Sequence, residues 1–209
     1  GAQDNPDLAY NQATVLDYLE DYQQAFDGLL RAKSIDPSLP AASAMDSLTR
    51  HVARVHDLVT RKGRVKPKRL SALVATLPDA GKQARMAAAP AADGRAPGPN
   101  PGKMLLLKLA ISASQADHIP AVLVMVDGNV DSVAVSLYHL DSKALGALSD
   151  KDVFIVLDPV VKDIKFDLPA SGVVEYCTIQ VGHPDMFICN GRSLASSFAP
   201  AALDITAFS

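Results

Sequence analysis

Residues 119–140 read IPAVLVMVDGNVDSVAVSLYHL and hold two apolar runs, 119–126 and 133–140. The stretch between them contains Asp127-Gly128-Asn129, whose residues are typical of turns. Short apolar runs that are rich in β-branched residues and bounded by turn residues indicate buried strands. The sequence therefore predicts two consecutive strands here, and this pair sets the fold class of the C-terminal half.

Further apolar runs flank this pair, at 104–111, 153–157, 173–181 and 186–189. A helical interruption fits only at 142–148. Short strands at this spacing predict an antiparallel barrel or sandwich. Because five or six strands share the region with one short helix, residues 103–209 are predicted to form an OB-fold domain, a five- to six-stranded antiparallel barrel.

The first 61 residues show helical patterning instead. Two helices are indicated by apolar residues at helical spacing: Leu8, Leu16 and Leu19 in the first, then Ala25, Leu29 and Ala32 in the second. Pro37 closes the second helix. A third helix, residues 40–61, carries an apolar stripe at spacings of three and four: Met45, Leu48, Val52, Val55 and Val59. The fold class is therefore multidomain, with an α part followed by an all-β part.

The chain of 209 residues is 48% hydrophobic and 21% charged, values ordinary for a packed globular protein. No apolar run approaches the roughly 18 residues of a membrane helix, so no membrane contact is expected. The charge is unevenly spread: residues 1–60 carry a net −5, residues 61–103 carry +8 and residues 104–209 carry −6. This asymmetry draws attention to the basic middle of the chain.

Six basic residues fall within 61–69. Gly63 is expected to break the preceding helix, and Pro67 to open the next one. A linker follows, because 16 of the 24 positions from 79 to 102 are Ala, Pro or Gly. The predicted domains are 1–77 for the helices and the basic segment, 78–102 for the linker, and 103–209 for the OB fold.

Two cysteines, Cys177 and Cys189, lie in strand-like runs joined by Gly182-His183-Pro184-Asp185. A hairpin about these four residues would place Cys189 opposite Thr178 and turn Cys177 to the other face. A disulfide is therefore not expected. Both cysteines are interpreted as free buried thiols, which suit the cytosol or the nucleus.

The helical half resembles a tetratricopeptide repeat of about 34 residues that starts at Pro6 and closes with Pro37. The positions at which small and large residues let two helices approach are occupied by Ala13, Leu16, Ala25, Leu29 and Ala32. Two usual positions depart from the pattern and hold Ala9 and Gln12. Residues 40–61 would be the capping helix. Because one repeat cannot bury both its faces, further repeats are expected upstream.

The sequence also resembles a family of stress-responsive transcriptional co-activators that join a tetratricopeptide solenoid to an OB-fold domain. The segments that carry the resemblance are NPDL at 5–8, DP at 36–37, KGRVKPKRL at 62–70, SDKDV at 149–153 and FICNG at 187–191. The resemblance implies a solenoid packed on an OB-fold domain. It also implies scaffolding of co-activator complexes in the nucleus, and recognition of nascent tubulin on ribosomes that leads to tubulin mRNA decay.

The basic segment is the first candidate site. Lysine and arginine clusters neutralise phosphates and release counterions, and the resemblance implies contact with ribosomal RNA. The RNA-binding candidates are Lys62, Arg64, Lys66, Lys68 and Arg69. A solvated loop and a nuclear-localisation signal are the alternatives.

The concave face of the repeat is the second candidate site. Counted from the start of the repeat, the first helix would present Asp7, Tyr10, Asn11, Thr14 and Asp17 to a peptide. Two carboxylates and an amide suit a basic or amide-bearing peptide, and a nascent chain containing Arg fits. An ordinary polar solenoid face is the alternative.

The barrel is expected to contact proteins or to brace the solenoid. Its net charge repels a phosphate backbone, and its aromatic residues are scattered: Tyr138, Phe154, Phe166, Tyr176 and Phe187. An OB-fold nucleic-acid binder is the third alternative. The sequence holds no nucleophile motif, phosphate loop or metal-ligand spacing. We therefore expect no enzyme, catalytic residue, cofactor, metal or small-molecule substrate.

These observations favour a cytoplasmic and nuclear adaptor. Its expected partners are proteins bound through the repeat groove and the OB fold, together with the ribosome and nascent tubulin. The rival hypothesis is a nuclear co-activator module in the response to stress and DNA damage. In that case the basic segment is an import signal and contacts no RNA.

Overall fold

The computed structural model describes residues 5–78, 98–114, 119–169, 172–203 and 205, and the chain divides into two compact units. The helical unit comprises Gly1–Arg54, Ile164–Glu175 and Ala202–Ser209, and the barrel unit comprises Val55–Asp163 and Tyr176–Ala201. This division differs from the predicted domains, because the basic segment belongs with the barrel and part of the strand region belongs with the helices. Most of the predicted linker lies outside the described residues.

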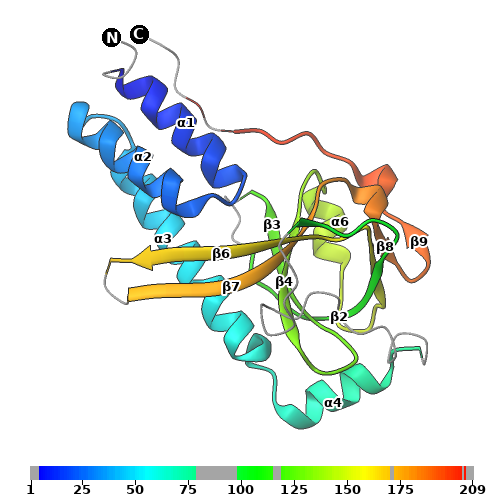
Figure 1. Ribbon diagram of the computed structural model, residues 1–209. Helices are drawn as coiled ribbons and strands as arrows, with labels where there is room; N and C mark the ends of the chain where they lie inside the picture. The colour runs from blue at the N-terminus through cyan, green and yellow to red at the C-terminus, as the bar shows by residue number, and fades with distance from the viewer. Residues whose placement is uncertain (1–4, 79–97, 115–118, 170–171, 204, 206–209) are drawn as a thin grey trace. The chain divides into compact units, whose positions relative to one another are not determined.

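The helical unit contains α1 (Pro6–Tyr18), α2 (Tyr22–Ile35) and the first part of α3 (Ala41–Thr60). Figure 1 shows α1 and α2 side by side. The Asn5 side chain caps α1 by accepting a hydrogen bond from the Leu8 amide at 2.9 Å. Ala13 and Ala25 are fully buried. A Cβ on Gly28 would lie 3.0 Å from the Ala13 Cβ. The two helices thus touch where their residues are small, which confirms the predicted close approach.

The buried face of α1 is not the face that its leucines suggest. Leu8 and Leu19, which mark this helix in the sequence, are both exposed. The helix buries Asp7, Tyr10 and Ala13 instead. The helix is therefore predicted correctly but its buried face is not, because the contact with α2 is made by small residues.

Helix α3 begins in the helical unit and ends in the barrel unit. Its buried stripe consists of Leu48, Val52, Val55 and Leu58, with Met45 and Val59 half-buried beside it. The predicted apolar stripe is therefore confirmed. Within the helical unit, the buried side chains of Tyr22 and His51 meet with 3.4 Å between the hydroxyl and Nε2.

The helical unit also contains the outer part of a two-stranded hairpin. Its strands are β6 (Val160–Leu168) and β7 (Gly172–Val181). Phe166 is fully buried and packs edge-to-face on Phe26 of α2, with ring centroids 5.7 Å apart. Gln23 accepts a hydrogen bond from the Asp167 amide at 3.0 Å. Strand β6 was not predicted, because it alternates charged and apolar residues and therefore shows no continuous apolar run.

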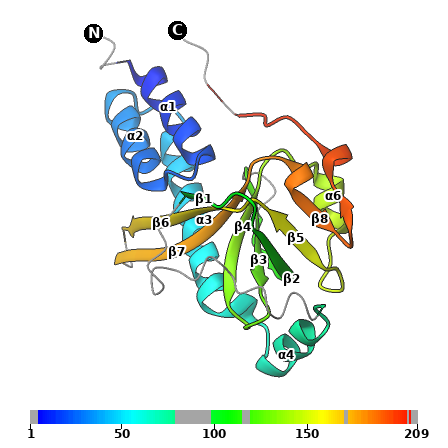
Figure 2. The ribbon, with the colours of Figure 1, turned by 45° about the vertical axis from the view of Figure 1, so that its right-hand side comes forward.

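The barrel unit contains α4 (Pro67–Ala75), β1 (Gly98–Pro99), β2 (Met104–Ser112), β3 (Ala121–Val126), β4 (Ser132–Leu137), α6 (Ser142–Ala147), β5 (Phe154–Leu157), β8 (Phe187–Cys189) and β9 (Arg192–Ser193), with the inner parts of β6 and β7. Each of the six predicted apolar runs forms a strand, and the predicted helical interruption is α6. Figure 2 shows β2, β3, β4 and β5 of this unit.

The strand order is β1-β6-β7-β4-β3-β2-β5-β8-β9. Strands β5 and β6 follow each other in the chain, separated by Asp158 and Pro159. One of them pairs with β2 and the other with β7, so this bent segment closes the sheet into an OB-fold barrel. The pair β4–β7 is parallel, with Ala134 opposite Thr178. The barrel is therefore mostly rather than purely antiparallel.

The predicted hairpin at residues 182–185 does not form. Strand β8 pairs with β5 and β9, so Cys189 lies opposite Phe154 instead of Thr178. The physical reason is aromatic burial, because Phe187 stacks on Phe154 with ring centroids 5.3 Å apart. Both cysteines are free; Cys177 is buried, whereas Cys189 is only half-buried. Burial raises the pKa of the Cys177 thiol to about 12.

Both faces of the central strands are buried. The inner face forms the barrel core with Leu107, Leu123, Met125, Val135, Phe154, Ile179 and Phe187. On the outer face, Val122, Val124, Val126, Ala134 and Ser136 are buried as well. Part of this outer cover is α4, because Leu70, Val74 and Leu77 form a cluster with Val126. Among the described helices, none is long and apolar enough to cross a membrane.

Candidate functional site

The basic connector, residues 61–69, contains a docked turn between the end of α3 and the start of α4 at Pro67, and it is not a freely solvated loop. Residues Lys62–Arg64 form a 3₁₀ turn, with hydrogen bonds from the Arg64 amide to Arg61 and from the Val65 amide to Lys62. The φ angles of Lys62, Gly63 and Arg64 are 49°, 68° and 58°. Only glycine adopts this left-handed region without cost. The turn therefore depends on contacts that compensate for the two strained residues.

Gly63 provides one such contact. It is buried against β2, and a Cβ at this position would lie 3.0 Å from the Ala110 Cβ and 3.1 Å from Ile111 Cγ2. Any larger residue would crowd Ala110 and Ile111 and would be strained at a φ of 68°. The glycine that the sequence marks as a helix breaker thus also seats the connector on the barrel.

Three of the five RNA-binding candidates are engaged within the barrel unit. The Lys62 ammonium donates a hydrogen bond to the Val130 carbonyl at 2.7 Å. Arg64 Nε donates to the Asp57 carboxylate at 3.0 Å. Arg69 donates to Asp150 at 2.6 Å. The guanidinium groups of both arginines remain largely exposed. Lys62, in contrast, is half-buried.

The two arginines at the start of the connector perturb one carboxylate. Arg64 donates to Asp57, and Arg61 Nε lies 2.9 Å from the same carboxylate. The hydrogen bond from Arg64, together with the charges of Arg61, Arg64 and His56, lowers the pKa of Asp57. Asp57 therefore stays ionised and holds the connector against the last turn of α3.

Lys66 and Lys68 are the two candidates whose side chains are exposed and have no hydrogen bond or ion pair with any described residue. Lys66 is the N-cap of α4, Pro67 is its first residue, and the first turn contains no acidic residue. The N-terminus of a helix carries a partial positive charge and favours anions. Lysines placed there are repelled by the positive end of the helix dipole. A bound anion would offset this repulsion.

A buried lysine beside the connector was not identified as a site in the sequence. Lys108 is only 2% exposed, and its ammonium donates to the carbonyls of Lys151 and Asp152, both at 3.0 Å. Burial lowers the pKa of this lysine, and the charges of Asp152 and Asp150 partly oppose the shift. Since Asp150 also binds Arg69, the loop 149–152 links the connector to the barrel. The feature of the sequence that could have indicated this buried lysine is the position of Lys108, a charged residue within the apolar run 104–111.

Asp152 holds this loop together. Its carboxylate accepts hydrogen bonds from Asn190 at 2.7 Å and from the Ser149 amide at 2.8 Å. Burial alone would raise the pKa of Asp152, but the hydrogen bonds of Asn190 and Ser149 and the charge of Lys108 outweigh it and lower the pKa. The stabilisation is therefore present above the ordinary pKa and is lost as the pH falls through the lowered one.

We predict that Asp152→Asn lowers the free energy of unfolding at pH 7 by about 1 kcal/mol, because charged hydrogen bonds are lost at a partly exposed site. The wild type is expected to lose this advantage as the pH falls below the ordinary pKa of 3.8 and through the lowered pKa of Asp152. Urea unfolding at several pH values measures both effects. A constant difference between the two proteins at every pH would contradict the prediction.

The peptide-binding candidates on α1 do not share one environment. Asp7 and Tyr10 are buried, at 9% and 6% exposure, so this structure does not offer them to a ligand. The Thr14 hydroxyl donates to the Tyr10 carbonyl at 3.1 Å. Asn11 is half-buried. Asp17 differs, because one of its carboxylate oxygens is buried and has no hydrogen-bond partner among the described residues.

The Asp17 carboxyl is strongly perturbed. Burial, assisted by the charge of Glu20, raises its pKa from 3.8 to about 7. A separate cavity of about 260 Å³ lies between α1 and α2 and is lined by Ala9, Gln12, Ala13, Leu16, Gln24, Asp27, Gly28 and Arg31. None of the five peptide-binding candidates lines it. Asp17 is thus the candidate on α1 with unused hydrogen-bonding capacity.

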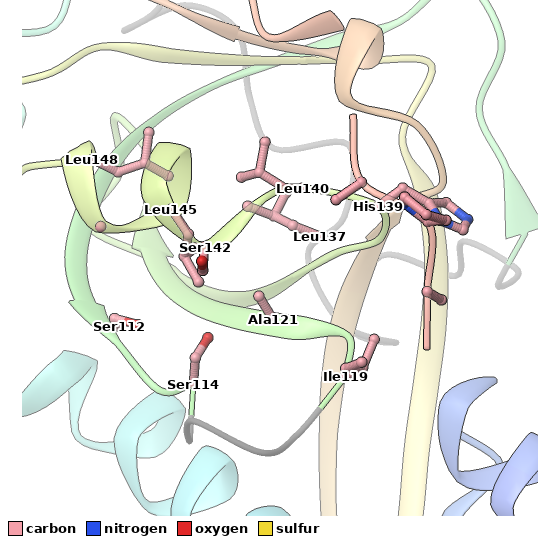
Figure 3. Close-up of a pocket in the computed structure, with 14 residues that line it drawn as sticks. Ser112, Ser114, Ile119, Ala121, Leu137, His139, Leu140, Ser142, Leu145 and Leu148 are labelled. Carbon is pink, nitrogen blue, oxygen red and sulfur yellow. The ribbon is translucent and has the colours of Figure 1, made fainter. Parts of the chain in front are cut away.

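A larger cavity of about 570 Å³ lies in the barrel unit beside α6. Figure 3 shows its apolar wall of Leu137, Leu140, Leu145 and Leu148, with Ser112, Ser114 and His139 at its margin. The Ser114 hydroxyl is already bonded to the backbone of Val122. The described lining contains no carboxylate and no lysine or arginine. The cavity is therefore suited to apolar groups and not to phosphate.

Five aromatic residues of the strand region cannot serve as stacking platforms in this structure. All five that the sequence analysis considered are buried: Tyr138, Phe154, Phe166, Tyr176 and Phe187. Base stacking requires exposed rings. No cluster of metal-ligating side chains is found among the described residues. These five rings therefore provide no exposed surface on which bases could stack.

The fold and the site together define a class: a multidomain protein with a tetratricopeptide-type helical hairpin and an OB-fold barrel that carries a docked basic connector. The family model described as "Tetratricopeptide repeat protein 5 OB fold domain" matches residues 95–202, just over half of the chain. The chain belongs to this tetratricopeptide repeat protein 5 family.

Curated relatives agree with this assignment. Tetratricopeptide repeat protein 5 of Mus musculus is 26% identical over 221 residues, covering 96% of this chain and 48% of the relative. The protein of the same name from Homo sapiens is 26% identical over 211 residues, covering 94% of this chain and 47% of the relative. The chain thus spans about half the length of the curated relatives it matches.

Proposed function

We propose that this chain is a non-enzymatic adaptor whose basic connector docks on ribosomal RNA while its helical and OB-fold parts contact proteins. In this function it takes part in the recognition of nascent tubulin and in the autoregulation of tubulin mRNA. The observation that carries the proposal is the first turn of α4, where Lys66 and Lys68 are exposed beside a helix N-terminus.

The electrostatics of this turn support an anionic partner. Two free ammonium groups and the helix dipole add to the same positive potential. The guanidinium groups of Arg64 and Arg69 widen it, since both remain exposed although each binds a carboxylate. A phosphate backbone would replace the unfavourable lysine–dipole repulsion by attraction and would release counterions.

Ribosomes and tubulin place this activity in the cytoplasm, and co-activator scaffolding would place the protein in the nucleus as well. We therefore propose both locations. A purely nuclear co-activator remains the second candidate function, since a lysine-rich exposed turn is also what an import signal requires.

Asp17 supports the peptide-binding part of the proposal. A buried carboxylate oxygen that has no partner in the described part of the chain is costly in the free protein, and the charge of a lysine or arginine would offset this cost. The chemistry of the expected ligand is therefore a basic residue of a nascent chain.

The decisive experiment is co-sedimentation with translating ribosomes at about 50 to 200 mM salt. Lys66→Glu combined with Lys68→Glu is expected to weaken binding by more than about tenfold, because two attractive contacts become repulsive. The matched control is Lys33→Glu combined with Lys143→Glu, two exposed lysines outside the connector. It carries the same change in net charge and is expected to bind as the wild type does.

Equal weakening in both variants would show a nonspecific charge effect and would contradict connector docking. If ribosome binding persists in the connector variant while its entry into the nucleus fails, the basic segment is an import signal and the co-activator hypothesis takes precedence.

A further inference from the structure

The turn between β3 and β4 has an unusual backbone at the point where it meets the connector. Val130 has a φ of 65°, a left-handed conformation that is costly for a β-branched residue. Asp127 enforces the turn, because its buried carboxylate accepts hydrogen bonds from the amides of Asn129 and Asp131, both at 2.9 Å. Strain of this kind persists where the surrounding structure requires it.

The Val130 carbonyl accepts the hydrogen bond from the Lys62 ammonium at 2.7 Å. Lys62, the first of three successive left-handed residues in the connector, thus binds a left-handed residue of the barrel. A second bond lies beside them, since the Ser132 hydroxyl donates to the Val59 carbonyl at 2.6 Å. The contact is therefore a specific docking arrangement and not a loose association of a charged loop with a surface.

We propose that Lys62 is a positioning residue and not a phosphate ligand: by binding the Val130 carbonyl it seats the connector on the barrel and so presents Lys66 and Lys68 to RNA in a fixed place. This inference rests on the proposed docking to ribosomal RNA. Its physical basis is preorganisation, because a loop that is already ordered loses less conformational entropy on binding.

Lys62 and Lys66 carry the same charge, but the proposal gives them different roles, so their removal should affect RNA binding differently. Lys62→Met and Lys66→Met each remove one positive charge and keep an apolar stem. Removal of a phosphate contact lowers the slope of log affinity against log salt by about 0.7 to 0.9. Loss of preorganisation lowers the affinity by the same factor at every salt concentration and leaves the slope unchanged.

The experiment measures ribosome affinity of the wild type and both variants by sedimentation between about 50 and 200 mM salt. Lys66→Met is expected to reduce the slope. Lys62→Met is expected to weaken binding about five- to tenfold with an unchanged slope, the cost of ordering a few side chains again. Lys62→Arg is expected to restore binding, because a guanidinium can also donate to the Val130 carbonyl. A slope lowered by Lys62→Met, or an affinity equal to that of the wild type, would overturn the proposal.

A second measurement does not depend on RNA. Hydrogen–deuterium exchange of residues 61–70 is expected to accelerate in Lys62→Met, while exchange in β3 and β4 stays slow. Gly63→Ala keeps every charge and should produce the same acceleration, because its Cβ would displace the connector from Ala110. Unchanged exchange in the connector of Lys62→Met would overturn the seating role. If the wild type shows no ribosome binding but the exchange result holds, the proposed function fails while the seating role stands.

Discussion

Phe154→Ala is expected to lower the free energy of unfolding of the barrel by about 3–5 kcal/mol. Phe154 is fully buried and stacks on Phe187 with ring centroids 5.3 Å apart. Its strand lies between β2 and β8, where it pairs with Leu107 and Cys189. Truncation would leave a cavity at the point where three strands meet, and a closed barrel cannot collapse readily into it.

Urea unfolding followed by circular dichroism measures this loss. The matched control is Phe198→Ala, which removes an aromatic ring that is 49% exposed. Its expected cost is about 1 kcal/mol or less. If both variants lost the same stability, the Phe154–Phe187 stack would not be the centre of the barrel core.

Asp17→Asn is expected to stabilise the protein at pH 8 by about 2–4 kcal/mol and to leave its stability at pH 4 nearly unchanged. Burial raises the pKa of Asp17 from 3.8 to about 7. The folded state therefore retains a proton that the unfolded chain releases between about pH 4 and pH 7. The free energy of unfolding of the wild type falls as the pH rises through this window, and the uncharged amide removes the loss.

Urea unfolding at pH 4 and pH 8 checks this result. Asp46→Asn is the matched control, because Asp46 is an exposed carboxylate on α3. Its unfolding curves are expected to coincide with those of the wild type at both pH values. A variant Asp17→Asn that is less stable than the wild type at pH 8 would show that the carboxylate has a favourable partner and would contradict the prediction.

A residue that destabilises the free protein at neutral pH is typical of a binding site. Its position in the repeat makes Asp17, like four other residues of α1, a predicted peptide-binding residue. The side chain of Asp17 as a whole is half-buried although one of its carboxylate oxygens is buried, whereas Asp7 and Tyr10 are buried as whole residues. Position in a repeat indicates which residues share a helix face, but burial depends on what packs against that face.

Several elements could be predicted because local physics specifies them. The alanines of α1 and α2 predicted a close helix contact, and Ala13 and Ala25 are fully buried. The apolar runs predicted the strands that form most of the barrel. Strand β6 was not predicted, because a strand that is buried on one face alternates polar and apolar residues and has no continuous apolar run.

Strand pairing was less predictable. The turn at residues 182–185 suggested a hairpin, yet β8 pairs with β5, which lies earlier in the chain. Proximity in sequence favours a hairpin through low loop entropy. The burial of Phe187 against Phe154 stabilises the pairing of β8 with β5 by more free energy than the short hairpin loop would save in entropy. This burial joins residues that are far apart in the chain.

By itself, the sequence determined the fold class, the positions of the helices and most strands, and a basic segment ending at a helix start. These features follow from apolar periodicity, glycine and proline, and net charge, all of which are local. Only the tertiary structure decided which cations are available. In the folded protein Lys62 binds Val130, Arg64 binds Asp57 and Arg69 binds Asp150. Lys66 and Lys68 remain exposed. The reason is that a side chain's availability depends on its partners, and two of these three partners, Val130 and Asp150, lie in loops distant in the sequence.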